Sequence, residues 1–155
     1  MLRRITGFHQ DEEGDWVAEL SCLHGQHVRH QPPFRDRPWV LSASGRESRI
    51  GTDMDCPLCD RAVLPAGLRV ERTVGPFDEK SLPAGLRRHH RVPDRGWGRL
   101  RVIEGAIDFS MATGPPLSRR LTAGDEQPIP PGVDHALDVT GAVVVVLDLL
   151  SRDES

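Results

Sequence analysis

Tyrosine is absent from the chain, and the other aromatic residues are scarce. The 155 residues include three Trp and four Phe but no Tyr, so a phenolic acid or base and a tyrosyl radical are excluded. Lys80 is the only lysine among 20 cationic residues. Schiff-base chemistry, which needs a lysine amine, would therefore depend on that single residue.

Long apolar segments are missing as well. The longest apolar run, residues 141–150, contains Asp148, whereas a membrane-spanning helix needs about 20 apolar residues. Residues 1–4 carry the charge of a signal peptide, but polar residues follow them at once, so we expect no membrane partner. The three cysteines are odd in number, which does not suit a disulfide framework. These features predict a cytoplasmic protein with reduced thiols.

The composition favours β structure. Gly (15) and Pro (13) together make up about one residue in six, which is above the usual share. So many turn-forming residues argue against a helical bundle and for a mainly β chain. The formal net charge of −3 gives no overall attraction to nucleic acid, which we do not expect as a partner.

Cysteine and histidine divide the chain into two parts. All three Cys and four of the seven His precede residue 60. After residue 68, apolar residues alternate with a period near two in short segments separated by turns, which is typical of a β-sandwich or barrel. We therefore predict a small Cys/His module at residues 1–63 and a β domain at residues 68–150.

Several local elements follow from the same patterns. Residues 3–10 and 15–21 read as two strands joined by a turn in which Gly14 takes a positive φ. Another strand is expected to begin at residues 37–41. In the second part we expect a turn at residues 104–106 and a buried Val-rich strand at residues 142–149.

The strongest chemical signal is a Cys-x-His pair followed by a Cys-x-x-Cys pair. Cys22 and His24 form the first pair, and Cys56 and Cys59 form the second. Three sulfurs and one nitrogen suit a tetrahedral zinc ion, and four protein ligands would make the metal structural. His27 is the alternative fourth ligand. A buried Cys22 beside a coincidental Cys-x-x-Cys, or a redox pair at Cys56 and Cys59, remains open.

A cationic stretch lies between the two pairs. Residues 24–49 contain five Arg against Asp36 and Glu47. Within it, Arg29, Arg35, Arg37 and Trp39 could hold an anion or a nucleic-acid phosphate. We favour a solvated surface instead, because the net charge of the module is negative.

Residues 1–60 resemble a small, uncharacterised bacterial family of Cys/His domains. The resemblance is carried by residues 7–12 (GFHQDE), 14–18 (GDWVA), 22–24 (CLH), 26–30 (QHVRH), 32–33 (PP), 37–39 (RPW), Cys56 and Cys59. No activity is implied by it. It does imply a functional surface beside the metal, formed by His9, Gln10, Asp11, Trp16, His27, Arg29 and His30.

Residues 124–135 fit the second cupin motif, Gly-x5-Pro-x-Gly-x2-His, which would aim His135 into the mouth of a barrel. With the segment 82–86, His90, the pair 97–98 and Gly105, residues 68–150 resemble the TehB/YeaR-like cupin family, associated by name with tellurite resistance. The resemblance implies a cupin-like β-barrel, a double-stranded β-helix. It also implies that His90 and His135 face the cavity.

The first cupin motif is incomplete. His89 and His90 are adjacent, so a strand would point them to opposite faces, and we expect His89 to face outward. The position of the usual Glu ligand holds Gly98. A second divalent metal held by His90 and His135 therefore remains open. We expect Trp97 in the core or at the cavity wall, where it could contact a ligand.

Three functions remain open from the sequence. The first is a metal-binding protein in which a structural zinc module is fused to a cupin that binds a small anion or metal oxyanion, in tellurite or oxidative stress. The second is a metal-dependent cupin enzyme of dioxygenase or isomerase type that uses His90 and His135. The third is a nucleic-acid or protein adaptor. A homodimer is compatible with each of them.

Overall fold

The chain forms two compact units. The computed structural model describes residues 1–88 and 90–153. Its N-terminal unit comprises Met1–Cys56 and its C-terminal unit Pro57–Ser155. The division at residues 1–63 and 68–150 stays a prediction, because compactness does not test whether either part folds alone. Among the described residues, no helix has both the length and the apolar character needed to cross a bilayer.

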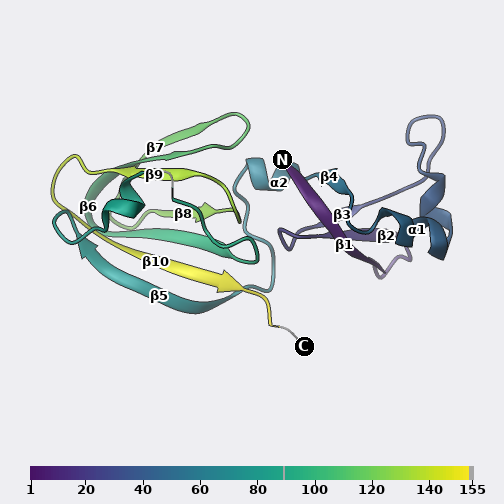
Figure 1. Ribbon diagram of the computed structural model, residues 1–155, viewed down its shortest axis with the longest axis horizontal. Helices are drawn as coiled ribbons and strands as arrows, with labels where there is room; N and C mark the ends of the chain where they lie inside the picture. The colour runs from purple at the N-terminus through teal and green to yellow at the C-terminus, as the bar shows by residue number, and fades with distance from the viewer. Residues whose placement is uncertain (89, 154–155) are drawn as a thin grey trace. The chain divides into compact units, whose positions relative to one another are not determined.

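The N-terminal unit is built on a four-stranded antiparallel sheet with the strand order β3-β2-β1-β4 (Figure 1). Its strands are β1 (Leu2–Gln10), β2 (Trp16–Leu20), β3 (Gly25–His27) and β4 (Asp53–Asp55). The expected hairpin of β1 and β2 is present, and Gly14 in its turn has a φ of 82°. Ile5, Leu20 and Val28 are fully buried beneath the sheet's loops and helices.

Two short helices occupy the place where we expected a strand to begin at residues 37–41. η1 (Pro38–Leu41) is a 3-10 helix, and α1 (Ala43–Arg49) follows it directly. Proline is favoured at the first helical position. The Ser42 hydroxyl then caps α1 by accepting a hydrogen bond from the Gly45 N–H at 3.0 Å. These start signals outweigh the strand tendency of residues 39–41, so the strand prediction is wrong.

The C-terminal unit is built from antiparallel β-strands, and the chain is mainly β, as expected. Its path is β5-β10-β6-β7, and β8 and β9 also pair with β6 (Figure 1). The elements are α2 (Pro57–Asp60), β5 (Arg69–Asp78), η2 (Ala84–Arg87), β6 (Trp97–Met111), β7 (Leu117–Thr122), β8 (Glu126–Ile129), β9 (His135–Asp138) and β10 (Val143–Ser151). The expected Val-rich strand is β10.

β6 passes without interruption through residues 104–106, where we expected a turn. Residues 97–105 of β6 pair with β10, and residues 106–111 pair with β7. Gly105 marks the change of partner with a φ of 75°. A Cβ at this position would lie 2.0 Å from the Ala142 carbonyl oxygen. Gly105 therefore bends a continuous strand, which the sequence pattern did not distinguish from a turn.

A buried carboxylate joins three strands of this sheet. Asp148 on β10 is 1% exposed. It accepts paired hydrogen bonds from Arg99 and from Arg101 on β6, at 2.8–3.0 Å, and one from the Thr73 hydroxyl on β5 at 2.7 Å. Burial alone would raise the pKa of Asp148, but the hydrogen bonds from Arg101, Thr73 and Arg99 lower it to about 2.

We predict that Gly105→Ala destabilises the protein strongly. Alanine is strained at the positive φ of this position, and its methyl group would also collide with the backbone. We therefore expect the free energy of unfolding to fall by about 3 kcal/mol or more. Gly124→Ala is the control, because Gly124 has a φ of 91° and open space around it. It should cost only about 1–2 kcal/mol. Urea unfolding of both variants measures the difference, and equal losses would contradict the steric argument.

We also predict an acid-labile contribution from Asp148. Because its pKa is lower in the folded than in the unfolded chain, its ionised form stabilises the fold above about pH 4. That stabilisation, about 2 kcal/mol, is lost as the pH falls towards about 2. Asp148→Asn should flatten the pH dependence of the unfolding free energy in this window. Asp108→Asn, which removes an exposed ion pair with Arg120, should leave the slope nearly unchanged.

Candidate metal centre

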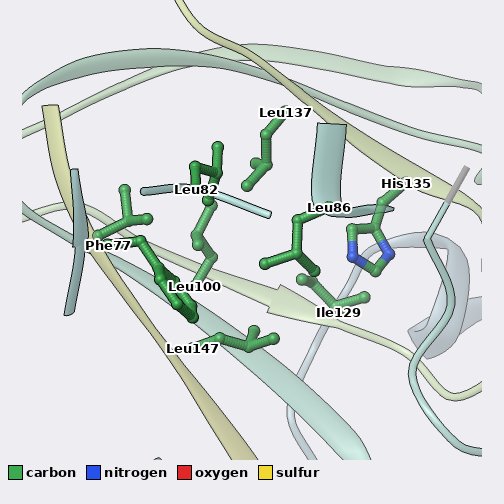
Figure 2. Close-up of a pocket in the computed structure, with 9 residues that line it drawn as sticks. Phe77, Leu82, Leu86, Leu100, Ile129, His135, Leu137 and Leu147 are labelled. Atoms are coloured by element: carbon green, nitrogen blue, oxygen red, sulfur yellow. The ribbon is translucent and has the colours of Figure 1, made fainter. Parts of the chain in front are cut away.

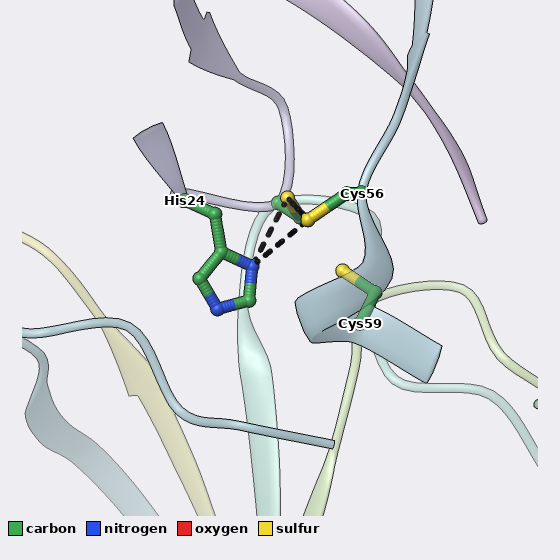
Figure 3. Close-up of side chains that lie close together, drawn as sticks. His24, Cys56 and Cys59 are labelled. Carbon is green, nitrogen blue, oxygen red and sulfur yellow. Dashed lines mark hydrogen bonds between the residues drawn. The ribbon is translucent and has the colours of Figure 1, made fainter. Parts of the chain in front are cut away.

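Four metal-ligating side chains meet at one buried point. The ligand atoms of Cys22, His24, Cys56 and Cys59 all lie within 4.8 Å of one another, and all four residues are buried. Figure 3 shows His24, Cys56 and Cys59 turned toward a common centre. This is the Cys/His grouping that the sequence pattern predicted, and it can hold a metal ion.

Local turns bring these side chains together. Cys22 and His24 lie in the tight turn between β2 and β3, which is closed by a hydrogen bond from the Leu23 N–H to the Leu20 carbonyl. Leu23 has a φ of 72°, which is uncommon for a residue with a branched side chain. Cys56 follows β4, and Cys59 lies on α2. Pro57 begins this helix, a position that suits proline.

The distances within the group fit a tetrahedral metal. The Sγ atoms of Cys22 and Cys56 are 3.8 Å apart, and Nδ1 of His24 lies 3.4 Å from each of them (Figure 3). Ideal tetrahedral bonds of about 2.3 Å to sulfur and 2.0–2.1 Å to nitrogen give edges of about 3.8 Å and 3.5 Å. The ligand atoms of Cys22, His24 and Cys56 are therefore spaced as three corners of one coordination sphere, and the Cys59 sulfur lies within 4.8 Å of each of them.

The electrostatics also favour a cation at this point. Burial on its own would lower the pKa of His24, but hydrogen bonds with the sulfurs of Cys22 and Cys56 raise it to about 9. The sulfurs thus attract positive charge to the imidazole nitrogen that faces them. The Gln26 side-chain amide lies 3.7 Å from the Cys56 sulfur, where it can orient the ligand from outside the coordination sphere.

His27, the alternative fourth ligand, is engaged elsewhere. Its Nε2 lies 2.8 Å from an Asp11 carboxylate oxygen, and its side chain is 53% exposed. His24, not His27, lies within the buried group. The His-rich segment of the sequence therefore contributes one residue to the centre.

The predicted functional surface is divided into separate pairs. His9 lies 2.9 Å from a Glu19 carboxylate oxygen, and Arg29 lies 3.1 Å from a carboxylate oxygen of Asp15. Nδ1 of His30 accepts a hydrogen bond from the Arg37 backbone N–H. The Arg46 guanidinium stacks on Trp16, 3.7 Å from the ring centroid. Sequence reasoning missed Glu19 and Arg46, because no spacing rule links them to the residues that they contact.

In the C-terminal unit, His90 and His135 lie side by side. Their backbones form an antiparallel bridge, and Nδ1 of His90 lies 3.2 Å from Nε2 of His135. Nδ1 of His135 lies 3.2 Å from the Val133 carbonyl, so this nitrogen carries the proton and Nε2 can accept one from His90. Burial lowers the pKa of both imidazoles. Within the described part of the chain, no third potential ligand completes a group with them.

The cavity beside this pair is narrow and apolar. It is lined by Phe77, Leu82, Leu86, Leu100, Ile129, His135, Leu137, Val145 and Leu147 (Figure 2). In Figure 2, His135 lies at the far end of the lining from Phe77. The free volume of about 10 Å³ is about that of one water molecule. His135 is the only residue of the lining with a polar side chain.

The sequence also linked Trp97 and His89 to this cavity. Trp97 is fully buried and is not among the residues that line this cavity, which agrees with the core position that the sequence left open; its role as a ligand contact stays a prediction. As a large apolar side chain on β6, it packs in the core. The expectation that His89 faces outward lies outside the described residues.

Comparisons with known families fit both parts of the chain. Residues 6–63 match a family described as protein of unknown function, DUF3565, and residues 72–146 match the TehB-like domain. Both resemblances seen in the sequence are confirmed. No curated protein matches the chain.

Solved structures resemble the C-terminal part. A protein of Escherichia coli K12 is 20% identical, with a TM-score of 0.52, over 59% of this chain and 97% of that chain. TehB from Haemophilus influenzae is 16% identical, with a TM-score of 0.49, over 56% of this chain and 32% of that chain. Fe(II)-HppE with an alternative substrate is 24% identical, with a TM-score of 0.31, over 34% of this chain and 29% of that chain. Of the three, the first establishes a shared fold and nothing beyond the fold.

We predict that metal retention depends on His24 and not on His27. His24→Ala removes one of four ligands, so the protein should retain less than about half an equivalent of metal and lose several kcal/mol of folding free energy. His27→Ala is the matched control and should retain metal like the parent. Elemental analysis and thermal unfolding of protein purified without added metal measure both effects. Equal metal content in the two variants would contradict this assignment of ligands.

Proposed function

We propose that the protein binds one zinc ion through Cys22, His24, Cys56 and Cys59, and that this zinc is structural. The observation that carries the proposal is the convergence of four buried ligand atoms within 4.8 Å of one another, three of them at the spacing of a tetrahedral site. Three sulfurs and one imidazole nitrogen are a common ligand set for structural zinc. Since all four positions are filled by protein, no position is left for substrate or activated water.

The zinc would stabilise a unit that has little other core. Apart from the cysteines, the buried apolar side chains of the N-terminal unit are Ile5, Val17, Ala18, Leu20, Val28 and Val40. Such a small core contributes only a few kcal/mol of net stability. Metal binding to a preformed site adds folding free energy directly. Reduced, metal-bound thiols also support the proposal of a cytoplasmic location.

The finer part of the proposal is that the C-terminal unit binds a small anion or metal oxyanion in tellurite or oxidative stress. Its support is the TehB-like match at residues 72–146. The narrow cavity has no Arg or Lys among the described residues of its lining, so the cavity would have to widen to admit an anion, which would be met there by His135. A homodimer is compatible with this proposal and adds nothing to it.

A metal-dependent enzyme is less well supported. Catalytic zinc sites commonly use three protein ligands and one open position. His90 and His135 supply two nitrogens 3.2 Å apart, and the described residues offer no third ligand beside them. A metal held by this pair would need solvent for most of its coordination sphere.

Metal stoichiometry of the full-length protein tests the zinc proposal. We expect about one zinc per chain and no second metal, as for other closed tetrahedral sites. His90→Ala, a change of a part-buried residue outside the Cys/His group, should leave the zinc content unchanged. A second metal such as iron or nickel that is lost in His90→Ala would favour the enzyme instead. A chain that carries no zinc would overturn the proposal.

Calorimetric titration tests the anion separately. Tellurite should bind the zinc-loaded protein more tightly than sulfate, which serves as the control anion. Equal heats for the two anions would contradict the anion part and leave the zinc part untouched.

A further inference from the structure

An exposed aromatic side chain is held at the tip of a short loop in the N-terminal unit. Phe34 is 93% exposed. The loop is closed beneath it by two backbone hydrogen bonds between Gln31 and Arg35, at 2.8 and 2.9 Å. At the base, Nδ1 of His30 accepts a hydrogen bond from the Arg37 N–H at 3.0 Å. The loop therefore presents a phenyl ring to solvent on a closed backbone.

The segment that follows this loop carries arginines without ion-pair partners. Within the described part of the chain, none of the ion pairs includes Arg35, Arg37, Arg46 or Arg49. Arg29 differs, because Asp15 neutralises it at 3.1 Å. The cationic stretch seen in the sequence thus separates into one neutralised arginine and four that no carboxylate contacts.

Two of these arginines lie on tryptophan rings. The Arg46 guanidinium is 3.7 Å from the centroid of Trp16, and that of Arg49 is 5.2 Å from the centroid of Trp39. Arg46 also donates to the Val40 carbonyl at 2.7 Å. A guanidinium stacked on a ring can still donate hydrogen bonds from its edge to a phosphate.

None of the residues of α1, the helix that contains Arg46 and Arg49, is buried. Leu41 and Ile50 at its two ends are 71% and 47% exposed. Residues 30–50, which we call the arginine lobe, run from the loop through η1 and α1 (Figure 1). This lobe exposes apolar and cationic side chains that the unit's core does not use.

We infer that the arginine lobe binds single-stranded nucleic acid, with Phe34 stacking on a base and Arg35, Arg37, Arg46 and Arg49 contacting phosphates. Proteins that bind single strands combine aromatic platforms with cationic grooves in this way. The net negative charge of the chain, from which we expected no nucleic acid, does not describe this lobe. Its four arginines exceed its two acidic residues, Asp36 and Glu47.

An acidic protein segment is the competing partner. Four cationic side chains would attract it equally well, but it would not need a fully exposed ring held at a loop tip. Stacking of an aromatic side chain on a base gives about 1–3 kcal/mol per base. The placement of Phe34 therefore favours the nucleic acid.

Fluorescence anisotropy of the full-length, metal-loaded protein with labelled oligothymidylate of about 20 nucleotides tests the inference. Binding should weaken steeply between about 50 and 200 mM salt, as expected for phosphate contacts. Phe34→Ala should weaken it about 5-fold or more, because a stacked ring is lost. Arg35→Ala with Arg37→Ala should lower the slope of log affinity against log salt by about 1.4.

Arg72→Ala provides the matched control, since Arg72 is an exposed arginine on β5. It should leave binding unchanged, and Phe34→Ala should leave thermal unfolding unchanged because its ring is exposed. Absence of binding at low salt would overturn the inference. So would a Phe34→Ala variant that binds like the parent, or competition by polyglutamate as effective as by unlabelled oligothymidylate. Concentration-dependent self-association that Phe34→Ala abolishes, without nucleic-acid binding, would assign the lobe to a second copy of the chain.

Discussion

Three sulfurs and one imidazole nitrogen converge on a single buried point, and a metal ion held there, as proposed, would tie the N-terminal sheet together. The turn after β2 supplies Cys22 and His24, and the end of β4 leads into Cys56. These segments lie on different parts of the sheet, so a metal held by the four side chains would join them and add folding free energy. The short β3 and β4, three residues each, would otherwise have little to keep them paired.

The pKa values of two buried histidines, His24 and His135, shift in opposite directions because their surroundings differ. Burial among apolar side chains lowers the pKa of His135. Its two ring nitrogens form hydrogen bonds with the Val133 carbonyl and with His90. For His24, burial acts in the same direction, but the sulfurs of Cys22 and Cys56 reverse the outcome. Burial thus favours the uncharged imidazole in one place, whereas the neighbouring sulfurs favour positive charge on the imidazole in the other.

Much of the fold and of the metal centre could be predicted from the sequence. Cys-x-His and Cys-x-x-Cys spacings specify ligand geometry locally, and the Gly-x5-Pro-x-Gly-x2-His motif located His135 opposite His90. The strand expected at residues 37–41 and the turn expected at residues 104–106 were wrong because the same local residues fit two different structures. Trp39, Val40 and Leu41 are residue types that favour a strand. Pro38, however, begins η1, and Ser42 caps α1. Gly105 looked like a turn, because a positive φ inside a paired strand has the same sequence signature. The stacking of Arg46 on Trp16 depends on tertiary contacts that no periodicity encodes.

The order of strands in the C-terminal sheet has a consequence for how this protein is made. β5 (Arg69–Asp78) lies at the edge, and among the described residues it pairs with β10 (Val143–Ser151) alone, a strand that follows it by more than 60 residues. During synthesis, β5 therefore emerges long before the strand that pairs with it. Its backbone N–H and C=O groups stay available to other chains until β10 has been synthesised. Pairings that join such distant segments also form slowly. β5 has exposed, charged residues, among them Glu71 and Arg72. Such residues oppose aggregation through an edge strand that has not yet found its partner.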